Sequence, residues 1–381
     1  MQDNKIKKIL KWIISLLPIR NSILLESVPD LSDNTLSLYE YFLKIGLNKT
    51  YRIVWKVNSM QNYDLPKNVI CISSENAWNI VRFYYYRFFS KVIISCNKSI
   101  GSIHKNQVSF YLNHGTPCKR TRDYFNISKN VNYCLVPSDY LKELYSYEFN
   151  VDVDKIFTTG FARNDELFHP LDLHNIISTN FEKVVVWYPT FRQHKTQKKI
   201  VNTKIKNALP LLTNDEDIYR LDNYLMNSST ILVIKPHFAQ DMQYIKSIRT
   251  NNILFIDDEF FKKNNIKSYQ FVGNCDALLT DYSSIYYDYT LCDKPIGLVW
   301  DDFEEYSSNP GLIHNYEYYF QGGEKIYSID ELILFIKRVH DNIDLLNKER
   351  NFIKRIVNVS CTPDCSKRTS DFIIDKSSIK L

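Results

Sequence analysis

Short apolar runs alternate along this chain with longer segments in which apolar residues recur every three or four positions. The runs are rich in Val and Ile, which favours buried strands, and the segments between them, such as 35–45 and 138–147, have the periodicity of amphipathic helices. Strands separated by helices pair in parallel, so the pattern predicts an α/β protein. The predicted strands begin at Ser22, Tyr51, Asn68, Lys91, Val108, Asn132 and Lys155 in the first half of the chain and at Glu182, Ser229, Asn252, Cys275 and Lys294 in the second.

A polar segment over residues 169–180 separates these two series of strands. A length of 381 residues also favours two domains over one core. We therefore expect two doubly wound, Rossmann-type domains that face each other across a cleft, the first over residues 21–172 and the second over 181–350. The stretch after Ser328 is predicted to be helical, and residues 351–381 are expected to cross back to the first domain.

Polar clusters follow four of the predicted strands at their carboxyl ends. In a doubly wound sheet, ligands bind beyond the carboxyl ends of the strands, so we expect these clusters to converge on one cleft. The clusters are His114-Gly115-Thr116, "YPTFR" over 188–192, "KPH" over 235–237 and "TDYSS" over 280–284.

The "TDYSS" cluster opens a predicted helix, which suggests an anion site. A helix N-terminus presents free amides, and two serine hydroxyls would add donors for a pyrophosphate. An arginine grips phosphate oxygens in a bidentate fork, and a lysine and a histidine lie on a neighbouring strand end. The alternatives are helix capping by the hydroxyls and a salt bridge for the arginine. The predicted phosphate-binding residues are Arg192, Lys235, His237, Thr280, Asp281, Ser283 and Ser284.

His114 follows a predicted strand of the first half, and Gly115 beside it permits close approach to the backbone. An imidazole titrates near physiological pH and is well suited to take a proton from an attacking hydroxyl. We therefore interpret His114 as a candidate general base facing the phosphate site. A capping or core hydrogen bond is the alternative role for a single histidine.

Composition and charge narrow the class of protein only a little. The formal net charge of +5 is compatible with an anionic substrate or surface, and no long Lys/Arg tract indicates a nucleic-acid partner. The eight cysteines are scattered, and Cys361 and Cys365 lack a second pair at zinc spacing. Reduced thiols in a cytosolic protein are the expectation.

The N-terminal sequence "NKIKKILKWIISLLPIR" mixes lysines with Trp12 and aliphatic residues at helical spacing. Its apolar part is shorter than the roughly 20 residues that span a bilayer, and no small-residue cleavage site follows it. We predict that residues 1–20 form an amphipathic helix on an anionic membrane surface. Capping of the first domain is the alternative.

Several of these segments, in their order and spacing, resemble the CDP-glycerol glycerophosphotransferase family, whose enzymes prime and polymerise teichoic acids and related capsules. The segments are "NHGTPCKR", "TTGFARND", "YPTFR", "IKPH" and "ALLTDYSSIYYDYTLCDKPIGLVWDDFEEY". "ILLESVPDLSDNTLSLYEYF" resembles the opening segment of the family, so the likeness runs from about Ser22 to Phe372.

The resemblance implies a GT-B-like fold, a CDP-alcohol donor, a lipid-linked or polymer acceptor, and neither an essential metal nor a permanently bound cofactor. It implies that His114 acts as the base and that His237 contacts the donor phosphates. Gly115, Thr116 and the phosphate-binding set above would complete the site, with Asp288 facing the alcohol of the donor. It also implies a peripheral location on the cytoplasmic face of the cell membrane.

The chain departs from the family pattern at three positions. Asn113 stands where an aromatic residue or Lys is frequent, Phe191 stands where Trp is usual, and "KPHF" replaces the commoner Lys-Leu-His-Pro. The chain also lacks the added modules of long polymerases. Priming, short transfer and polymerisation are therefore all compatible with this sequence.

Three other functions stay open at this stage. CDP-ribitol could replace CDP-glycerol as the donor. A glycosyltransferase of the same architecture would use a nucleotide sugar, with Asp301 or Glu304 contacting the ribose. A non-catalytic module that binds a polyanion at the membrane would need the N-terminal lysines but not His114.

Overall fold

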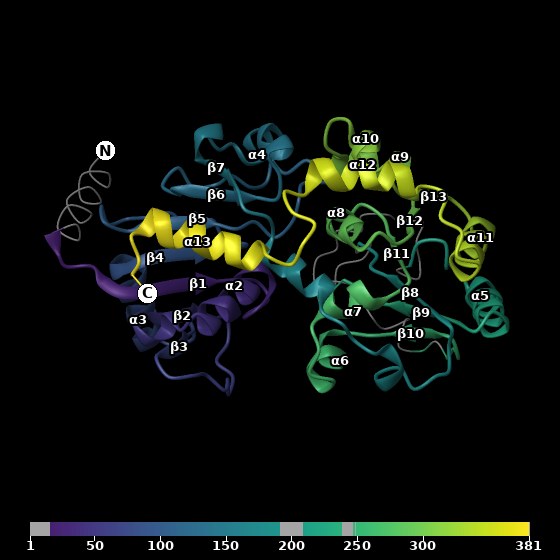
Figure 1. The fold of residues 1–381 in the computed structure, drawn as a ribbon, viewed down its shortest axis with the longest axis horizontal. Coiled ribbons are helices and arrows are strands. Elements are labelled where there is room, and N and C mark those ends of the chain that lie inside the picture. Colours follow the sequence, from purple (N-terminus) through teal and green to yellow (C-terminus); the bar gives the residue numbers. More distant parts are fainter. Residues whose placement is uncertain (1–15, 191–208, 238–246, 248, 381) are drawn as a thin grey trace. The chain divides into compact units, whose positions relative to one another are not determined.

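Two parallel sheets organise the chain, one in each of two units. Our computed structural model describes residues 16–190, 209–237, 247 and 249–380 (Figure 1). Unit 1 comprises Met1–Thr116, Thr121–Asp165 and Thr362–Leu381, and unit 2 comprises Pro117–Arg120 and Glu166–Cys361. The sequence analysis set boundaries near 172, 181 and 351, whereas the units divide at 165/166 and 361/362.

Unit 1 holds a seven-stranded parallel sheet in the order β3-β2-β1-β4-β5-β6-β7. This is the strand order of a doubly wound fold, extended by one strand. The strands are β1 (Arg20–Glu26), β2 (Arg52–Lys56), β3 (Val69–Ile72), β4 (Ser90–Ser95), β5 (Val108–Tyr111), β6 (Tyr133–Val136) and β7 (Ile156–Thr158).

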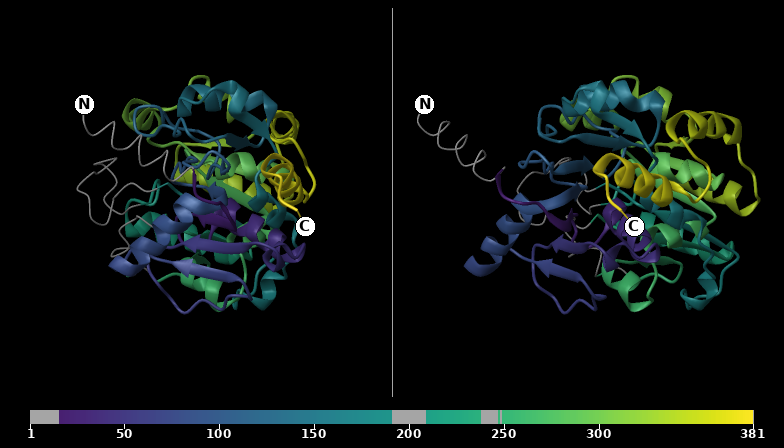
Figure 2. Two further views of the ribbon diagram at one scale, coloured as in Figure 1. Left: turned by 90° about the vertical axis from the view of Figure 1, so that its left-hand side faces the viewer. Right: turned by 60° about the vertical axis from the view of Figure 1, so that its left-hand side comes forward.

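Helices cover both faces of the unit 1 sheet. Ile23 and Leu25 of β1 lie in the larger apolar cluster and Leu24 in a smaller one, as the two-residue period of a strand requires. Helices α2 (Asp33–Lys44) and α13 (Cys365–Ser377) contribute to the larger cluster. Helix α3 (Ala77–Phe89) contributes Tyr86 to the smaller one, and both views in Figure 2 show α3 and the yellow α13 on opposite sides of the sheet.

Unit 2 holds a six-stranded parallel sheet in the order β10-β9-β8-β11-β12-β13. Helices α5 (Asp215–Asn227) and α11 (Ile329–His340) bury their apolar stripes in one cluster with β8, β9 and β11. The strands are β8 (Lys183–Trp187), β9 (Thr230–Ile234), β10 (Ile253–Phe255), β11 (Ala277–Thr280), β12 (Ile296–Val299) and β13 (Glu324–Ile326).

The remaining helices are short and mostly connect strands. They are α4 (Lys142–Phe149) in unit 1, and α6 (Asp258–Lys263), α7 (Ser268–Asn274), α8 (Ile285–Tyr289), α9 (Phe303–Tyr306), α10 (Tyr316–Tyr319) and α12 (Asn347–Val357) in unit 2. The predicted helix over 138–147 begins instead with a 3-10 turn over Asp139–Leu141, capped by the Ser138 side chain, before α4.

Every predicted strand is present within a residue or two of its predicted start. Strand β13 was missed because only Ile326 of its three residues is buried, too weak an apolar signal to detect. The predicted α/β class with parallel sheets is therefore confirmed.

In each sheet the order in which successive strands are added reverses at one place, between β1 and β4 in unit 1 and between β8 and β11 in unit 2. These are the topological switch points, where loops diverge and leave a crevice at the carboxyl ends of the strands. Residues 188–190 directly follow β8, and "TDYSS" begins with Thr280, the last residue of β11, so these described residues lie at the switch point of unit 2.

Two predictions fall partly or wholly outside the described residues. Of residues 1–20, which are predicted to form a helix, only those from Leu16 onward are described, and Arg192 lies in a stretch that is not described. Among the described residues, no helix is long and apolar enough to cross a bilayer, and no group of three or more His, Cys, Asp or Glu side chains could hold a metal ion. Six of the eight cysteines are buried, and Cys361 is exposed.

Candidate functional site

The switch point of unit 2 is built by hydrogen bonds between the loops after β8 and β11. The backbone N–H of Tyr188 donates to the Leu279 carbonyl oxygen at 2.9 Å, which continues the sheet by one residue. The Thr280 hydroxyl then donates to the Tyr188 carbonyl oxygen at 3.0 Å. The two loops therefore leave the sheet together.

Asp281 joins the two loops directly. Its carboxylate is fully buried and accepts from the backbone N–H of Thr190 at 3.0 Å and from the Thr190 hydroxyl at 2.9 Å. The backbone N–H of Tyr282 also donates to this carboxylate, at 2.7 Å. A charged group out of water requires such donors, so the geometry gives Asp281 a role in shaping the site. Thr190 was not singled out from the sequence, although it lies within the quoted "YPTFR" segment.

Two further residues of the predicted set are buried in contacts of their own. Thr280 is fully buried, and Asp288 is 2% exposed and accepts from the Tyr269 hydroxyl at 2.6 Å. Both side chains therefore support the "TDYSS" turn and the short helix behind it.

Ser283 and Ser284 differ from these residues because both are only partly buried. Helix α8, which they precede, is five residues long, and the Ser284 side chain makes no capping hydrogen bond in the described structure. The predicted contribution of the helix dipole is therefore small here. What the turn offers a ligand is its two hydroxyls and neighbouring backbone amides.

Lys235 and His237 follow β9, the neighbour of β8 on the side away from β11. The Lys235 ammonium lies 3.0 Å from Oδ1 of Asp258 and over the rings of Tyr188 and Phe261. Its side chain is largely buried by these contacts. His237 is partly buried.

The chain after His114 enters unit 2 almost at once. Segment Pro117–Arg120 belongs to unit 2, where Lys119 forms an antiparallel bridge with Leu312. Burial raises the pKa of the Cys118 thiol; Lys119 opposes the rise, whereas Asp288 and Asp281 add to it. Cys118 therefore lies within electrostatic reach of the "TDYSS" segment.

In unit 1, His114 follows β5, next to the switch point between β1 and β4. Its side chain is exposed to solvent, but crowded protein atoms disfavour the charged imidazolium and lower its pKa below the usual 6.5. Arg163 lowers the pKa further, whereas Asp33 and a hydrogen bond to the Cys96 backbone raise it. The ring is thereby favoured as the neutral form at neutral pH.

Gly115 and Thr116, the other predicted residues of this loop, are buried. The Tyr145 hydroxyl contacts both, at 3.3 Å from the Gly115 carbonyl oxygen and 3.3 Å from the Thr116 hydroxyl. These two residues therefore anchor the loop, and His114 is its exposed member.

Residues 9–373 match the family model described as CDP-glycerol:poly(glycerophosphate) glycerophosphotransferase. The chain belongs to this family. As a family member it is a transferase of teichoic acid biosynthesis that uses CDP-glycerol as its donor. The resemblance seen in the sequence is thus confirmed.

Curated relatives agree with this assignment of the glycerophosphotransferase. The teichoic acid glycerol-phosphate transferase of Staphylococcus aureus is 24% identical over 351 residues, which cover 80% of this chain and 82% of the relative. The teichoic acid glycerol-phosphate primase of Bacillus subtilis is 22% identical over 300 residues, with 73% and 72% covered. A teichoic acid poly(ribitol-phosphate) polymerase of Bacillus spizizenii is also 22% identical, over 61% of this chain and 36% of the relative.

Among solved structures, the wall teichoic acid polymerase TagF superposes on the glycerophosphotransferase with a TM-score of 0.72 at 19% identity. The match covers 98% of this chain and 94% of the other. A TagF variant soaked with CDPG matches with a TM-score of 0.70. The predicted GT-B-like fold is confirmed.

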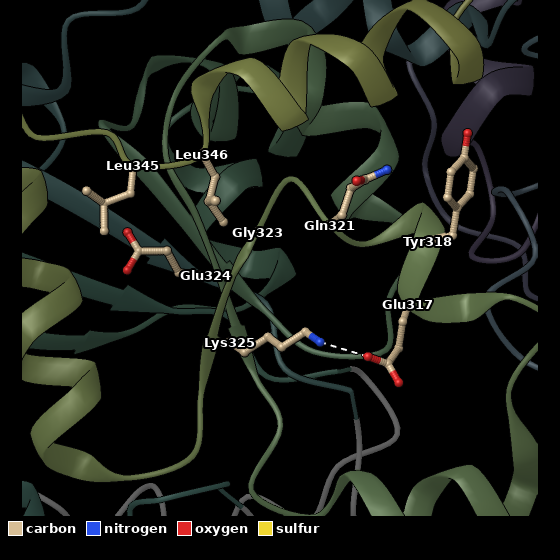
Figure 3. Close-up of a pocket in the computed structure, with 8 residues that line it drawn as sticks. All are labelled: Glu317, Tyr318, Gln321, Gly323, Glu324, Lys325, Leu345 and Leu346. Atoms are coloured by element: carbon tan, nitrogen blue, oxygen red, sulfur yellow. Dashed lines mark hydrogen bonds and ion pairs between the residues drawn. The ribbon is translucent and has the colours of Figure 1, made fainter.

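A separate hollow of about 580 Å³ lies beside β13 of the glycerophosphotransferase (Figure 3). The Lys325 ammonium within it bonds to Glu317 at 2.8 Å. None of the predicted site residues lines this hollow, so we do not assign the donor to it. Its lining residues are Glu317, Tyr318, Gln321, Gly323, Glu324, Lys325, Leu345 and Leu346.

Proposed function

We propose that the glycerophosphotransferase moves glycerol phosphate from CDP-glycerol to a hydroxyl of a lipid-linked or polymeric teichoic acid or capsule acceptor, with release of CMP. The family match over residues 9–373 is the observation that carries this proposal. CDP-glycerol acts as a substrate, and the proposal requires neither a resident metal nor a nucleic-acid partner.

The donor would bind at the switch point of unit 2, where the "TDYSS" and "YPT" turns meet. Ser283 and Ser284 would donate to the diphosphate from their partly buried positions. Asp281, tied to Thr190, would hold the turn in shape, and His237 would contact the phosphates from the end of β9. Arg192 is included in this donor set on the sequence alone.

His114 would take the proton from the acceptor hydroxyl. The acceptor oxygen attacks the β-phosphorus, the new O–P bond forms, and the P–O bond to CMP breaks with its electron pair leaving on CMP. Phosphoryl transfer of this kind depends on positioning and charge stabilisation rather than on a covalent enzyme intermediate. The lowered pKa of His114 supports the role, because a base must be neutral before it accepts a proton.

Chain connectivity also supports pairing this base with that donor site. Only Gly115 and Thr116 lie along the chain between His114 and segment Pro117–Arg120 of unit 2. Cys118 in that segment is within electrostatic reach of Asp281 and Asp288. The base is thus covalently tethered, through two anchored residues, to the unit that carries the donor cluster.

We further propose peripheral attachment to the cytoplasmic face of the cell membrane, through the basic N-terminal segment. Leu16 and Leu17 at its described end are 61% and 47% exposed. The Leu17 carbonyl oxygen lies 2.9 Å from Nε2 of His104, and Arg20 pairs with Ser90, directly after α3.

The outer face of α3 exposes Trp78, Ile80, Val81, Tyr84 and Tyr85. Exposed Trp and Tyr side chains favour the interfacial region of a bilayer.

A donor assay tests the proposed function. Purified protein is incubated with a lipid-linked or polymeric acceptor and with CDP-glycerol, CDP-ribitol or a UDP-sugar, and the free nucleotide is measured. CMP release from CDP-glycerol is expected to be fastest, and UDP release would contradict the proposal.

The His114→Ala variant should lose about 10²–10⁴-fold in kcat because general-base catalysis contributes that much. Near-normal turnover of the folded variant would remove His114 as the base.

CDP-ribitol remains the second candidate donor, because ribitol-phosphate polymerases and primases are among the relatives. The two CDP-alcohols share the nucleotide and diphosphate, so only the alcohol end can separate them. Competition between them at equal concentration, with each product identified by mass, decides which one this enzyme prefers.

Membrane attachment has its own test. The protein is sedimented with vesicles of phosphatidylglycerol and with vesicles of phosphatidylcholine. We expect binding to the anionic vesicles, and weaker binding after Lys5, Lys7, Lys8 and Lys11 are replaced by Gln. Equal binding to both vesicle types would contradict an electrostatic attachment.

A further inference from the structure

Residues from two distant parts of unit 1 hold the backbone on both sides of His114. Arg163 is 8% exposed, and its Nη1 donates to the His114 carbonyl oxygen at 2.7 Å and to Oδ1 of Asp33 at 2.6 Å. Asn34 is 1% exposed; its Nδ2 donates to the Asn113 carbonyl oxygen at 2.8 Å, and its Oδ1 accepts from the backbone N–H of Arg163 at 3.1 Å. We call Asp33, Asn34 and Arg163 the His114 clamp.

The clamp controls the direction of the His114 side chain. The Asn113 carbonyl belongs to the peptide plane before the His114 Cα, and the His114 carbonyl belongs to the plane after it. Each peptide is rigid, so fixing both planes fixes the two soft dihedrals of His114 and with them the Cα–Cβ bond. Asn34 holds the first plane, and Arg163 holds the second.

Neighbouring contacts strengthen this hold. The Cys96 thiol donates to the Asn113 carbonyl oxygen at 2.9 Å, and Nδ2 of Asn113 donates to the Leu135 carbonyl oxygen at 2.7 Å. Asn113 and Asp33 both adopt positive φ angles, of 59° and 60°. Asn and Asp adopt this left-handed conformation more readily than other non-glycine residues do.

We propose that Asp33, Asn34 and Arg163 are positioning residues for catalysis, which aim the His114 imidazole at the acceptor hydroxyl. The inference rests on the proposed role of His114 as the base. It assigns a role to the stretches "SDN" over 32–34 and "FARND" over 161–165, which are not part of the proposed donor site. A misplacement of the base by about 1 Å can cost roughly 10²-fold in rate.

The electrostatics of the clamp make the proposal sharply testable. The groups that influence His114 are the crowded protein around the ring, Asp33 at the start of α2, Arg163 in the 162–168 turn and the Cys96 backbone after β4. Asp33 raises the pKa of His114, and Arg163 lowers it. Removing one charge at a time must therefore move the titration of His114 in opposite directions.

The experiment compares Asp33→Asn, Arg163→Met and Arg163→Lys with wild type in pH profiles of kcat. Asp33→Asn should move the acidic limb to lower pH, and Arg163→Met should move it to higher pH. Both should lower kcat by about 10²-fold with little change in KM for CDP-glycerol, because the donor binds to unit 2. Arg163→Lys keeps the charge but replaces the planar guanidinium, whose Nη1 makes both bonds, and should keep the limb in place while kcat falls.

Arg338→Met is the matched control. Arg338 pairs with Glu324 in unit 2, and their side chains are 23% and 13% exposed. This variant loses a partly buried ion pair of the same kind and should leave kcat and the pH profile unchanged. If Arg163→Met does not fold, Asp33→Asn and Arg163→Lys, which change little volume, still decide the question.

Three outcomes separate the hypotheses. Opposite shifts with a fall in kcat support the clamp. Shifts in the same direction, or wild-type kcat in folded Asp33→Asn and Arg163→Lys, overturn it while leaving the proposed function intact. If the His114→Ala variant itself has normal turnover, His114 is not the base. This result contradicts the proposed mechanism and, with it, the proposed role of the clamp.

Discussion

Apart from the extra strand β7 of unit 1, the two sheets share one strand order, but the polar groups at their switch points make different contacts. In unit 2, the carboxylate of the fully buried Asp281 bonds to the loops themselves, whereas Ser283 and Ser284 are only partly buried. In unit 1, buried polar groups grip the backbone around a single exposed imidazole. In the proposed mechanism, the same topology therefore binds the donor in unit 2 and orients a catalytic side chain in unit 1.

Replacing Asp281 in unit 2 and His114 in unit 1 should give the largest contrast in the free energy of unfolding. Asp281→Ala should destabilise the protein by about 3 kcal/mol or more, because buried donors on Thr190 and Tyr282 lose a charged acceptor. His114→Ala should change stability by less than about 0.5 kcal/mol, because its side chain is exposed. Urea unfolding followed by circular dichroism measures both. A stable Asp281→Ala protein would show that the unit 2 loops do not depend on this tie.

Variants of Ser283 and Ser284 test the proposed donor site directly. Ser283→Ala and Ser284→Ala should each lower kcat/KM for CDP-glycerol by up to about 10²-fold if the hydroxyls stabilise the charge that develops on CMP. Steady-state CMP release measures the loss. Ser307→Ala is the control, since Ser307 is a partly buried serine of unit 2 that bonds to the Phe303 carbonyl oxygen. A loss of the same size in the control would point to general destabilisation instead.

Lys235 has two candidate roles, an ion pair with Asp258 and a contact with a donor phosphate. Variants of the two residues distinguish these roles. Lys235→Met should raise KM for CDP-glycerol about tenfold if the ammonium also reaches a phosphate. Asp258→Asn removes the partner at 3.0 Å and should leave KM unchanged or slightly lower, because the ammonium is then freer to bind phosphate. A rise in KM for both variants would make the ion pair, rather than the ammonium, the required feature.

The smallest expected effect concerns Glu26 at the end of β1. Burial raises the pKa of this carboxyl above its usual 4.5, although backbone N–H donors from residues 96–98 oppose the rise. The folded state therefore holds the proton more tightly, so stability is lost as pH rises between the unfolded and folded pKa values. The loss is about 1.4 kcal/mol for each pH unit that separates those two values.

Glu26→Gln removes the titrating group and should flatten that part of the stability profile. Urea unfolding between pH 4.5 and 7 compares the variant with wild type. An unchanged slope would show that other groups, such as the buried Asp165 with its own raised pKa, dominate in this range.

Sequence reasoning located the strands and their polar ends well. A run of three valines marks β8 and the apolar residues Ala277–Leu279 mark β11, and the polar residues at the ends of both strands follow from chain order alone. It could not assign contacts, because Thr190 and Asp281 are 91 positions apart and meet only through the pairing of β8 with β11.

The residues around His114 show the same limit. Asn34 and Arg163 are 129 positions apart, and nothing local to either segment indicates that both reach one loop. The "SDN" stretch reads as the start of a helix, and "FARND" reads as a turn. Only the parallel sheet, which gathers loops from separate crossovers at one edge, brings them to the backbone of residues 113 and 114.

The amino-acid pattern by itself thus determined the class of fold, the two series of strands and the strand ends that carry polar residues, because hydrophobic periodicity and the succession of segments along the chain are local properties. Tertiary structure alone decided which polar groups are consumed in supporting the site and which stay available to a substrate. Hydrogen bonds between distant loops determine which groups are used in this way. A buried polar group without a partner would raise the free energy of the folded state, so these bonds are formed.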